Sequence, residues 1–167
     1  FDRYATIDVV RAVAESGRDD IILYTGNDDN IIHDLLTPFN FKEVTLRISG
    51  GLLGQWAVGT KSAQELMRKI RTGGGATGEW ARLNASLTDF NAAMFDAANN
   101  FAGCIPGINE VLHREGLLPS NRCLNPKEKL SPGQKEELDR VCKAYPDWQD
   151  TTFIKENLER WLEPETG

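Results

Sequence analysis

Apolar and polar positions alternate with two different periods in the first 72 residues. Apolar residues at helical spacing predict a helix that Thr6 caps and Gly17 ends. The β-branched run Ile21–Thr25 predicts a strand, and a second helix follows it until Pro38. Lys42–Ser49 predicts a second strand, and Trp56–Arg71 a third helix. This order predicts two parallel strands joined by a right-handed crossover.

After Gly73-Gly74-Gly75 the strand pattern does not return. Helical spacing of apolar residues predicts a long helix over Gly78–Asn100 and shorter helices after Pro106, after Ser131 and after Asp150. We therefore expect an α/β part in residues 1–72 and an all-helical extension in residues 73–167. Because two strands alone make no stable parallel sheet, the α/β part needs partner strands that this chain does not supply.

Both predicted strands end in small or polar residues. Thr25 and Gly26 close the first strand and are followed by Asn27, Asp28 and Asp29, while Ile48 and Ser49 close the second. Ligand sites of α/β folds lie at the carboxyl ends of their strands, so two such ends in succession suggest part of a barrel opening. The acidic and amide residues also suit the start of the next helix. We favour this capping role for Asp29 and the pocket role for Thr25 and Gly26.

Composition narrows the possible partners. The chain has 167 residues, 40% of them hydrophobic and 26% charged, as in an ordinary soluble protein. A net charge of -6 argues against nucleic acid or an anionic membrane as the main partner, and no apolar run approaches the roughly 20 residues that span a bilayer. The three cysteines lack C-x-x-C spacing, which argues against a metal site or a disulfide framework. Reduced thiols and the absence of a signal-peptide pattern favour the cytoplasm.

Three segments together resemble one enzyme family. Thr25-Gly26-Asn27-Asp28-Asp29 resembles the S/T-G-x-D corner after the seventh strand of the dihydrodipicolinate synthase/N-acetylneuraminate lyase family. Leu46–Gly50 resembles the G-x-I-S end of its eighth strand, and Gly107–Leu118 resembles its late K-x-x-L-x-x-x-G-L-L helix. The resemblance implies the C-terminal part of a (β/α)8 TIM barrel followed by a helical extension. It also implies Schiff-base chemistry on 2-keto acids, as an aldolase, lyase, synthase or dehydratase.

The catalytic groups of that family fall outside this chain. By the resemblance, the chain begins after the sixth strand, so the Schiff-base lysine, the relay tyrosine and the threonine pair that holds the keto-acid carboxylate are missing. Lys42, Lys61 and Lys69 are no substitutes, since their expected positions offer neither desolvation nor a cationic neighbour. We therefore expect a fragment that is inactive alone, has no catalytic residue and needs no cofactor. Its expected partners are the missing N-terminal half of the barrel, a small 2-keto acid and further copies of itself.

The resemblance also assigns a partial substrate pocket. It places Thr25, Gly26, Ile48 and Ser49 beside the missing lysine. Gly26 has no Cβ, so a ligand can approach the backbone closely there. Asn27 and Asp28 are expected to hydrogen-bond hydroxyl groups of a sugar-acid substrate.

Other interpretations of the sequence stay open. The chain is alternatively a non-catalytic helical interaction module whose two strands complete the sheet of a partner. Residues 73–78 match the G-x-G-x-x-G dinucleotide motif, but a helix and not a strand precedes them, which favours a connector over a nucleotide site. His33 and His113 lie 80 positions apart and are expected to be surface or core residues, not metal ligands.

Overall fold

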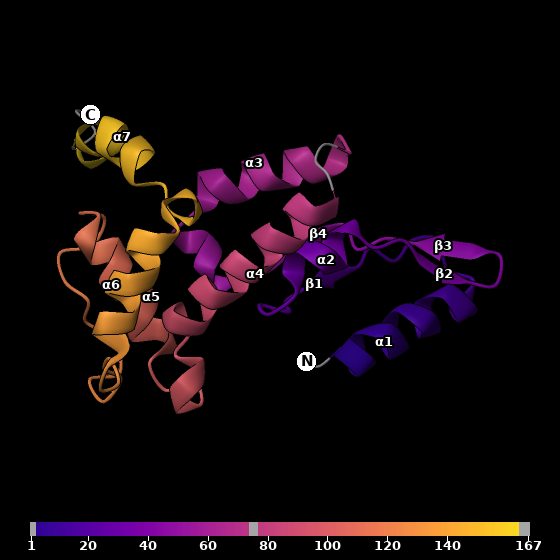
Figure 1. Cartoon of the computed structure of the whole chain (residues 1–167), viewed down its shortest axis with the longest axis horizontal. Coiled ribbons are helices and arrows are strands. Elements are labelled where there is room, and N and C mark those ends of the chain that lie inside the picture. Colours follow the sequence, from indigo (N-terminus) through magenta and orange to yellow (C-terminus); the bar gives the residue numbers. More distant parts are fainter. Residues whose placement is uncertain (1–2, 74–76, 164–167) are drawn as a thin grey trace. The chain divides into compact units, whose positions relative to one another are not determined.

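The computed structural model describes residues 3–73 and 77–163 of the chain (Figure 1). It divides into two compact units, each considered separately below. Unit 1 comprises Phe1–Leu53 and Leu66–Thr88, and unit 2 comprises Gly54–Glu65 and Asp89–Gly167. No helix among the described residues has both the length and the apolar character required to cross a bilayer.

The described elements are mostly helical, with two small sheets. In chain order the first are α1 (Arg3–Ser16), β1 (Tyr24–Thr25), α2 (Ile31–Leu36), β2 (Phe39–Phe41), β3 (Val44–Leu46) and β4 (Gly50–Gly51). The 3-10 helix η1 (Gly54–Ala57), α3 (Thr60–Arg71), α4 (Thr77–Met94) and η2 (Ala97–Asn99) follow. The last are α5 (Cys104–Arg114), α6 (Gln134–Ala144), η3 (Pro146–Trp148) and α7 (Thr151–Leu162). The prediction of a mixed α/β chain is confirmed, as is the absence of strands from the described residues after Gly73.

The first sheet is parallel, as the sequence predicts. In it Tyr24 of β1 lies opposite Gly50 of β4, and Thr25 lies opposite Gly51. Two hydrogen bonds extend the ladder, from Ser49 N to Leu23 O and from Leu52 N to Thr25 O, each 2.8 Å long. A parallel pair of strands separated by helix α2 is the arrangement expected of neighbouring strands in an α/β fold.

The second predicted strand is wrong in its position. Residues Val44–Leu46 pair with Phe39–Phe41 in an antiparallel hairpin, and the pairing with β1 falls instead on Gly50–Gly51, the two residues after the predicted strand. The alternating segment Phe39-Asn40-Phe41 supplies the hairpin partner directly after Pro38. At Gly50 the absence of a side chain has a structural use, since a Cβ there would overlap the ring of Tyr24.

Unit 1 has its own hydrophobic core around α1, α2 and the hairpin. Helix α1 packs against β2 and β3, and the guanidinium of Arg11 lies 5.6 Å from the centre of the Phe41 ring. The buried apolar residues come from every element of the unit except β1, β3 and β4; they are Val10, Ala14, Ile31, Ile32, Leu35, Phe39, Ile48, Leu66, Trp80 and Leu87.

Unit 2 is built from helices only, and its core lies between α5, α6 and the C-terminal half of α4. Its buried apolar residues are Val58, Phe90, Ala93, Met94, Phe95, Val111, Leu138, Val141, Trp148 and Ile154. Helix α5 approaches α4 closely at Gly107, where a Cβ would overlap the main-chain oxygen of Met94. Trp80 in unit 1 and Trp148 in unit 2 are core residues, whereas Trp161 is exposed.

Several predicted helix caps are wrong because the side chains bind elsewhere. Thr6 lies inside α1, and its hydroxyl accepts a hydrogen bond from Asn27. Asn30, and not one of the residues 27–29, is the N-cap position of α2, and its side chain does not cap the helix. Asp150 precedes α7 as predicted, but its carboxylate accepts hydrogen bonds from the main-chain N–H groups of Lys61 (2.6 Å) and Ser62 (3.0 Å), at the start of α3.

The predicted long helix over Gly78–Asn100 is too long. Helix α4 ends at Met94, and Asp96 adopts the left-handed conformation with φ of 59°. The buried carboxylate of Asp96 accepts hydrogen bonds from the Gly103 N–H (2.9 Å) and the Ser131 hydroxyl (2.6 Å). A long-range polar contact therefore ends the helix where the apolar spacing alone continues it.

Candidate functional site

The carboxyl ends of β1 and β4 lie at the same edge of the parallel sheet. Thr25 is buried there and Gly26 is exposed, and a Cβ on Gly26 would lie 3.3 Å from the main-chain oxygen of Leu52. Ile48 is buried, while Ser49 is exposed and bonds through its N–H to Leu23. Ser49 therefore lies beside Leu23, the residue before β1, so Leu52 and not Ser49 is the neighbour of Gly26.

A fully buried carboxylate organises the end of β1. Asp34 of α2 accepts hydrogen bonds at Oδ2 from the Thr25 hydroxyl (2.8 Å) and from the Asn27 side-chain amide (2.7 Å). Its Oδ1 accepts a bond from the Asn30 amide (3.2 Å) and forms an ion pair with the guanidinium of Arg3. A buried charge is tolerated when it is paired and hydrogen-bonded in this way. We call Asp34, Thr25, Asn27, Asn30 and Arg3 the Asp34 cluster.

The Asp34 cluster uses groups that the sequence assigned to a substrate. The Asn27 side chain donates to both Asp34 and the Thr6 hydroxyl (2.8 Å), so its two N–H bonds are directed into the protein. The Asn27 main-chain N–H donates to the Thr25 hydroxyl oxygen at 3.2 Å, which tightens the corner after the strand. Thr25 and Asn27 therefore shape the end of the strand from within.

Gly26, Asp28 and Asp29 are the residues of this corner that reach the surface. Gly26 is exposed and Asp28 is half-buried. Partial burial raises the pKa of the Asp28 carboxyl above its ordinary value, and the negative charge of Asp29 raises it further. This corner therefore offers a ligand one exposed stretch of main chain and two carboxyl groups, those of Asp28 and Asp29.

Sequence reasoning missed the centre of the cluster, although a signal for it exists. Asp34 falls three positions after Ile31 and next to Leu35, so it lies on the buried face of α2. A carboxylate on an apolar helical face requires a polar partner in the fold. The partners Thr25 and Asn27 are the polar residues at the end of the preceding strand.

None of the three lysines considered above lies in a desolvated site. Lys42 is exposed in the turn between β2 and β3, with φ of 53°. Lys61 forms an ion pair with Glu65, and Lys69 forms one with Glu79. The ammonium groups of Lys61 and Lys69 are thus each paired with a carboxylate, and none of the three lysines is buried.

The other chemical candidates are also accounted for. Cys104, Cys123 and Cys142 form no disulfide, and burial raises the pKa of Cys142 to about 11, which makes it a poor nucleophile. Across residues 3–73 and 77–163, no group of three or more His, Cys, Asp or Glu side chains is arranged to hold a metal ion. Residues 74–76 of the glycine run lie outside the described residues, but a helix, α3, does precede the run.

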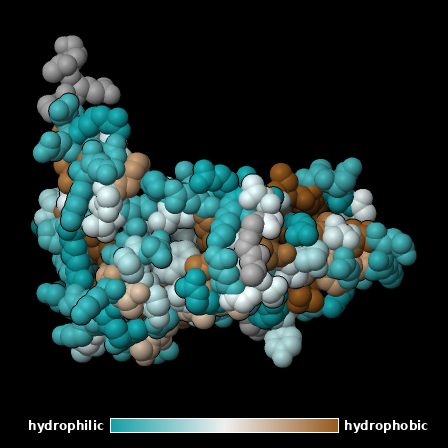
Figure 2. Space-filling model, turned by 45° about the horizontal axis from the view of Figure 1, so that its top comes forward, coloured by the Kyte–Doolittle hydropathy of each residue, from teal (hydrophilic) through white to brown (hydrophobic). Residues whose placement is uncertain are grey.

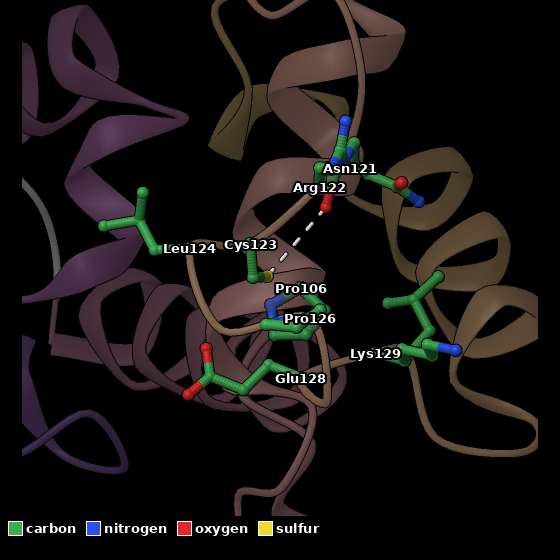
Figure 3. Close-up of a pocket in the computed structure, with 9 residues that line it drawn as sticks. Pro106, Asn121, Arg122, Cys123, Leu124, Pro126, Glu128 and Lys129 are labelled. Carbon is green, nitrogen blue, oxygen red and sulfur yellow. Dashed lines mark hydrogen bonds between the residues drawn. The ribbon is translucent and has the colours of Figure 1, made fainter.

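Unit 2 contains an open cavity on a different surface (Figure 3). It has a volume of about 560 Å³ and is lined by Pro106 of α5 and by eight residues of the segment that follows, namely 121–124, 126 and 128–130. The amide of Asn109 donates to the main-chain oxygen of Arg122 at 3.2 Å and so attaches this segment to α5. A second cavity of about 620 Å³ shares Arg122, Cys123, Leu124 and Glu128 with the first.

Comparison of the chain with protein-family models, with curated proteins and with solved structures gave no match in any of the three. Function is therefore inferred from the sequence motifs and from the geometry of the two units. The parallel strand ends of unit 1 and the cavity of unit 2 are the two features that require a functional explanation.

Proposed function

We propose that this chain is the C-terminal portion of a Schiff-base-forming enzyme that cleaves, condenses or dehydrates a 2-keto acid, of the dihydrodipicolinate synthase type. Its substrate would bind at the carboxyl ends of β1 and β4, beside a lysine supplied by polypeptide outside this chain. Thr25-Gly26-Asn27-Asp28 has the residue pattern of the family corner, and the parallel pairing of β1 with β4 supports the strand arrangement that the proposal needs.

The open edge of β1 is the observation that carries this proposal. Leu23 and Thr25 direct their main-chain oxygens toward the β4 side. Because successive residues of a parallel strand bond to opposite edges, the main-chain groups of Tyr24 face the other edge. Among the described residues no strand pairs with that edge. A barrel strand has a neighbour on both sides, so this edge is the place for a preceding strand.

Exposed apolar side chains mark the same sheet as incomplete. Ile22, Tyr24 and Leu52 are 69%, 58% and 69% exposed. Brown apolar residues interrupt a mostly hydrophilic surface in Figure 2. Parallel sheets are normally covered on both faces, so these side chains are expected to be buried by further strands or helices. Helix α1 comes immediately before β1 in the chain, which is the position of a crossover helix that leads from a preceding strand into β1.

The Asp34 cluster refines the roles of the pocket residues within this proposal. Thr25 and Asn27 would position the strand end through Asp34, while the main chain of Gly26 and the carboxyl of Asp28 would face the substrate. A rigid corner of this kind fixes the ligand-facing groups without contacting the ligand. In this proposal the lysine amine that forms the imine comes from polypeptide outside this chain.

Imine trapping tests the proposal directly. A protein that contains this chain together with its upstream sequence is incubated with pyruvate and sodium borohydride. The lysine amine attacks the keto carbon, water leaves, and hydride reduces the imine to a stable secondary amine that adds mass to the protein. The 167-residue chain treated in parallel should gain no mass, because none of the lysines in residues 3–73 and 77–163 is buried, as an imine-forming lysine needs to be. Longer 2-keto acids are tested in the same way.

The alternative function predicts different results. If the chain is a non-catalytic module whose strands complete a partner's sheet, neither the longer protein nor the 167-residue chain should gain an adduct. It would also fold as a stable monomer on its own in size-exclusion chromatography and circular dichroism. If the longer protein gains no adduct with any of the 2-keto acids, the Schiff-base proposal is refuted and the interpretation as a non-catalytic module remains.

A further inference from the structure

We propose that the cavity of unit 2 binds a short zwitterionic molecule, in which an anionic and a cationic group lie at the two ends of an apolar body. A peptide of two or three residues with free termini has this chemistry, and so does an ω-amino acid. Arg122 would bind the anionic end and Glu128 the cationic end (Figure 3). The cavity contains none of the strand-end residues of unit 1, so the inference does not depend on the function proposed above.

A long connection between two helices forms most of this cavity. Residues 115–133, between α5 and α6, contain no helix or strand. Connections longer than about 12–15 residues without secondary structure are uncommon in compact domains, and an ordered one usually has a function. This segment supplies most of the residues that line both cavities of unit 2. The two cavities share Arg122, Cys123, Leu124 and Glu128, which we call the shared wall.

Polar contacts with α5 hold this connection in place. The Asn109 amide donates to the main-chain oxygen of Arg122 at 3.2 Å, and the Asn121 amide donates to the buried carboxylate of Glu110 at 2.7 Å. Pro126 restricts the backbone further along the segment. The walls of the cavity are therefore formed before a ligand binds, and a preformed site loses little conformational entropy on binding.

Two opposite charges of the shared wall carry the inference. Among the residues that the structure describes, neither the guanidinium of Arg122 nor the carboxylate of Glu128 forms an ion pair, although five other arginines do. The Glu128 carboxylate accepts a long hydrogen bond of 3.5 Å from the Asn125 amide, which leaves most of its accepting capacity unused. A cation and an anion that line the same cavity without pairing favour a ligand that carries both charges.

The two charges lie apart from each other. In Figure 3 Arg122 and Glu128 are at opposite ends of the labelled group, and the rings of Pro106 and Pro126 lie between them. A ligand that reaches both must therefore hold its charges apart, with an apolar body against the prolines. A free α-amino acid carries both charges on one carbon and would reach only one of the two residues. The cavity volume of about 560 Å³ is within the roughly 300–1,000 Å³ of typical ligand sites.

Lys129 is the competing charge in this part of the molecule. It lines the first cavity but not the second, so it is not part of the shared wall. A ligand with two anionic groups would need Arg122 and Lys129 together, whereas a zwitterion needs Arg122 and Glu128, which line both cavities. The zwitterion therefore fits more of the observations, and a dicarboxylate is the contrasting probe.

Isothermal titration calorimetry tests the proposal on the 167-residue chain, and in parallel on the longer protein that contains it. The probes are the peptides Ala-Leu and Ala-Leu-Ala, the ω-amino acid 6-aminohexanoate, free alanine and the dicarboxylate glutarate. At least one of the first three should bind about 10-fold or more tightly than alanine and glutarate, because it alone pairs with both charges. Tighter binding of a peptide than of 6-aminohexanoate would identify a peptide as the ligand, and the reverse order an ω-amino acid.

Charge removal on both sides of the contact gives a sharper readout. Arg122→Gln and Glu128→Gln should each weaken binding of the best probe about 10-fold, since each removes one charge-assisted contact. Amidation of the probe's carboxylate should weaken binding to the wild type and not to Arg122→Gln, and N-acetylation should do the same for Glu128→Gln. Arg82→Gln and Glu159→Gln are the matched controls, because both residues are exposed and line neither cavity. Circular dichroism checks that every variant is folded.

Three results would overturn the proposal. The first is no binding of any zwitterionic probe at about 10 mM, a concentration at which even a weak specific ligand is bound. The second is glutarate that binds as tightly as the best zwitterion, which would assign the cavity to an anion. The third is binding that persists unchanged in both Arg122→Gln and Glu128→Gln. None of these results bears on the imine trap, and a failed imine trap would leave this site intact.

Discussion

Removing the buried carboxylate of Asp34 is the sharpest test of how the strand end is held. Asp34→Ala leaves the Thr25 hydroxyl and the Asn27 amide without their acceptor in a buried site. A hydrogen bond to a charged group contributes about 1.5–3 kcal/mol, so the loss of two predicts a decrease of about 3–6 kcal/mol in the free energy of unfolding. Breaking one side of a buried ion pair typically costs about 3–5 kcal/mol, which lies within this range.

The conservative variant Asp34→Asn separates the charge from the hydrogen bonds. It keeps one side-chain oxygen as an acceptor for Thr25 and Asn27, and loses the long bond from Asn30 and the attraction to Arg3, whose side chain is 42% exposed. Solvent screens that attraction, so we expect a loss of about 1–2 kcal/mol, well below that of the alanine variant. The ranking of the two variants is therefore part of the prediction.

Urea denaturation followed by circular dichroism measures the change in stability, and hydrogen exchange with mass spectrometry locates it. Protection should fall in peptides from β1 and α2, while peptides from α5 and α6 in unit 2 keep theirs. Asp19→Ala is the control, since Asp19 is exposed and close in sequence. If Asp34→Ala unfolds at the same urea concentration as this control, the cluster does not stabilise the strand end and the reasoning fails.

Two further predictions concern unit 2. Burial raises the pKa of Glu115 above its ordinary 4.5, and its Oε2 is buried without a hydrogen-bond partner. The charged carboxylate of Glu115 is disfavoured only in the folded state, so Glu115→Gln should stabilise the chain at pH 7. This gain in stability should shrink as the pH falls toward 4.5, which thermal melts across this pH range measure. Gly107→Ala should lower the free energy of unfolding by about 1–3 kcal/mol, because the new Cβ overlaps the Met94 carbonyl. The control Gly78→Ala, in the open first turn of α4, should leave this free energy unchanged or raise it. Urea denaturation measures both variants.

Local signals in the sequence were enough to predict most helices. Gly17 adopts φ of 68° directly after α1, and α2 ends two residues before Pro38. Gly116 likewise follows α5 with φ of 82°. Glycine and proline act on the backbone at their own position, so their effect does not depend on the rest of the fold. The parallel pairing was also predictable, because one helix lies between the two strand patterns.

Contacts between distant residues explain the errors. The Asp150 carboxylate caps α3, 88 and 89 positions earlier in the chain, and not the helix that it precedes. The Asp96 carboxylate ends α4 by bonding to Ser131, 35 positions away. The hairpin was missed for a different reason: Phe39–Phe41 is too short to show a period, and its pairing partner was already assigned to another strand.

The strand end of unit 1 shows why a motif alone does not assign ligand contacts. Thr25 and Asn27 alternate with Gly26 at a corner, so their side chains point to one side and the glycine backbone lies on the other. The sequence places these residues at the carboxyl end of β1, but only the fold reveals that Asp34 occupies the side toward which both polar groups point. Hydroxyl and amide groups that are saturated within the protein cannot also bind a substrate without losing those bonds. Specificity at this corner would therefore come from the main chain of Gly26 and the carboxyl of Asp28, and from residues beyond this chain.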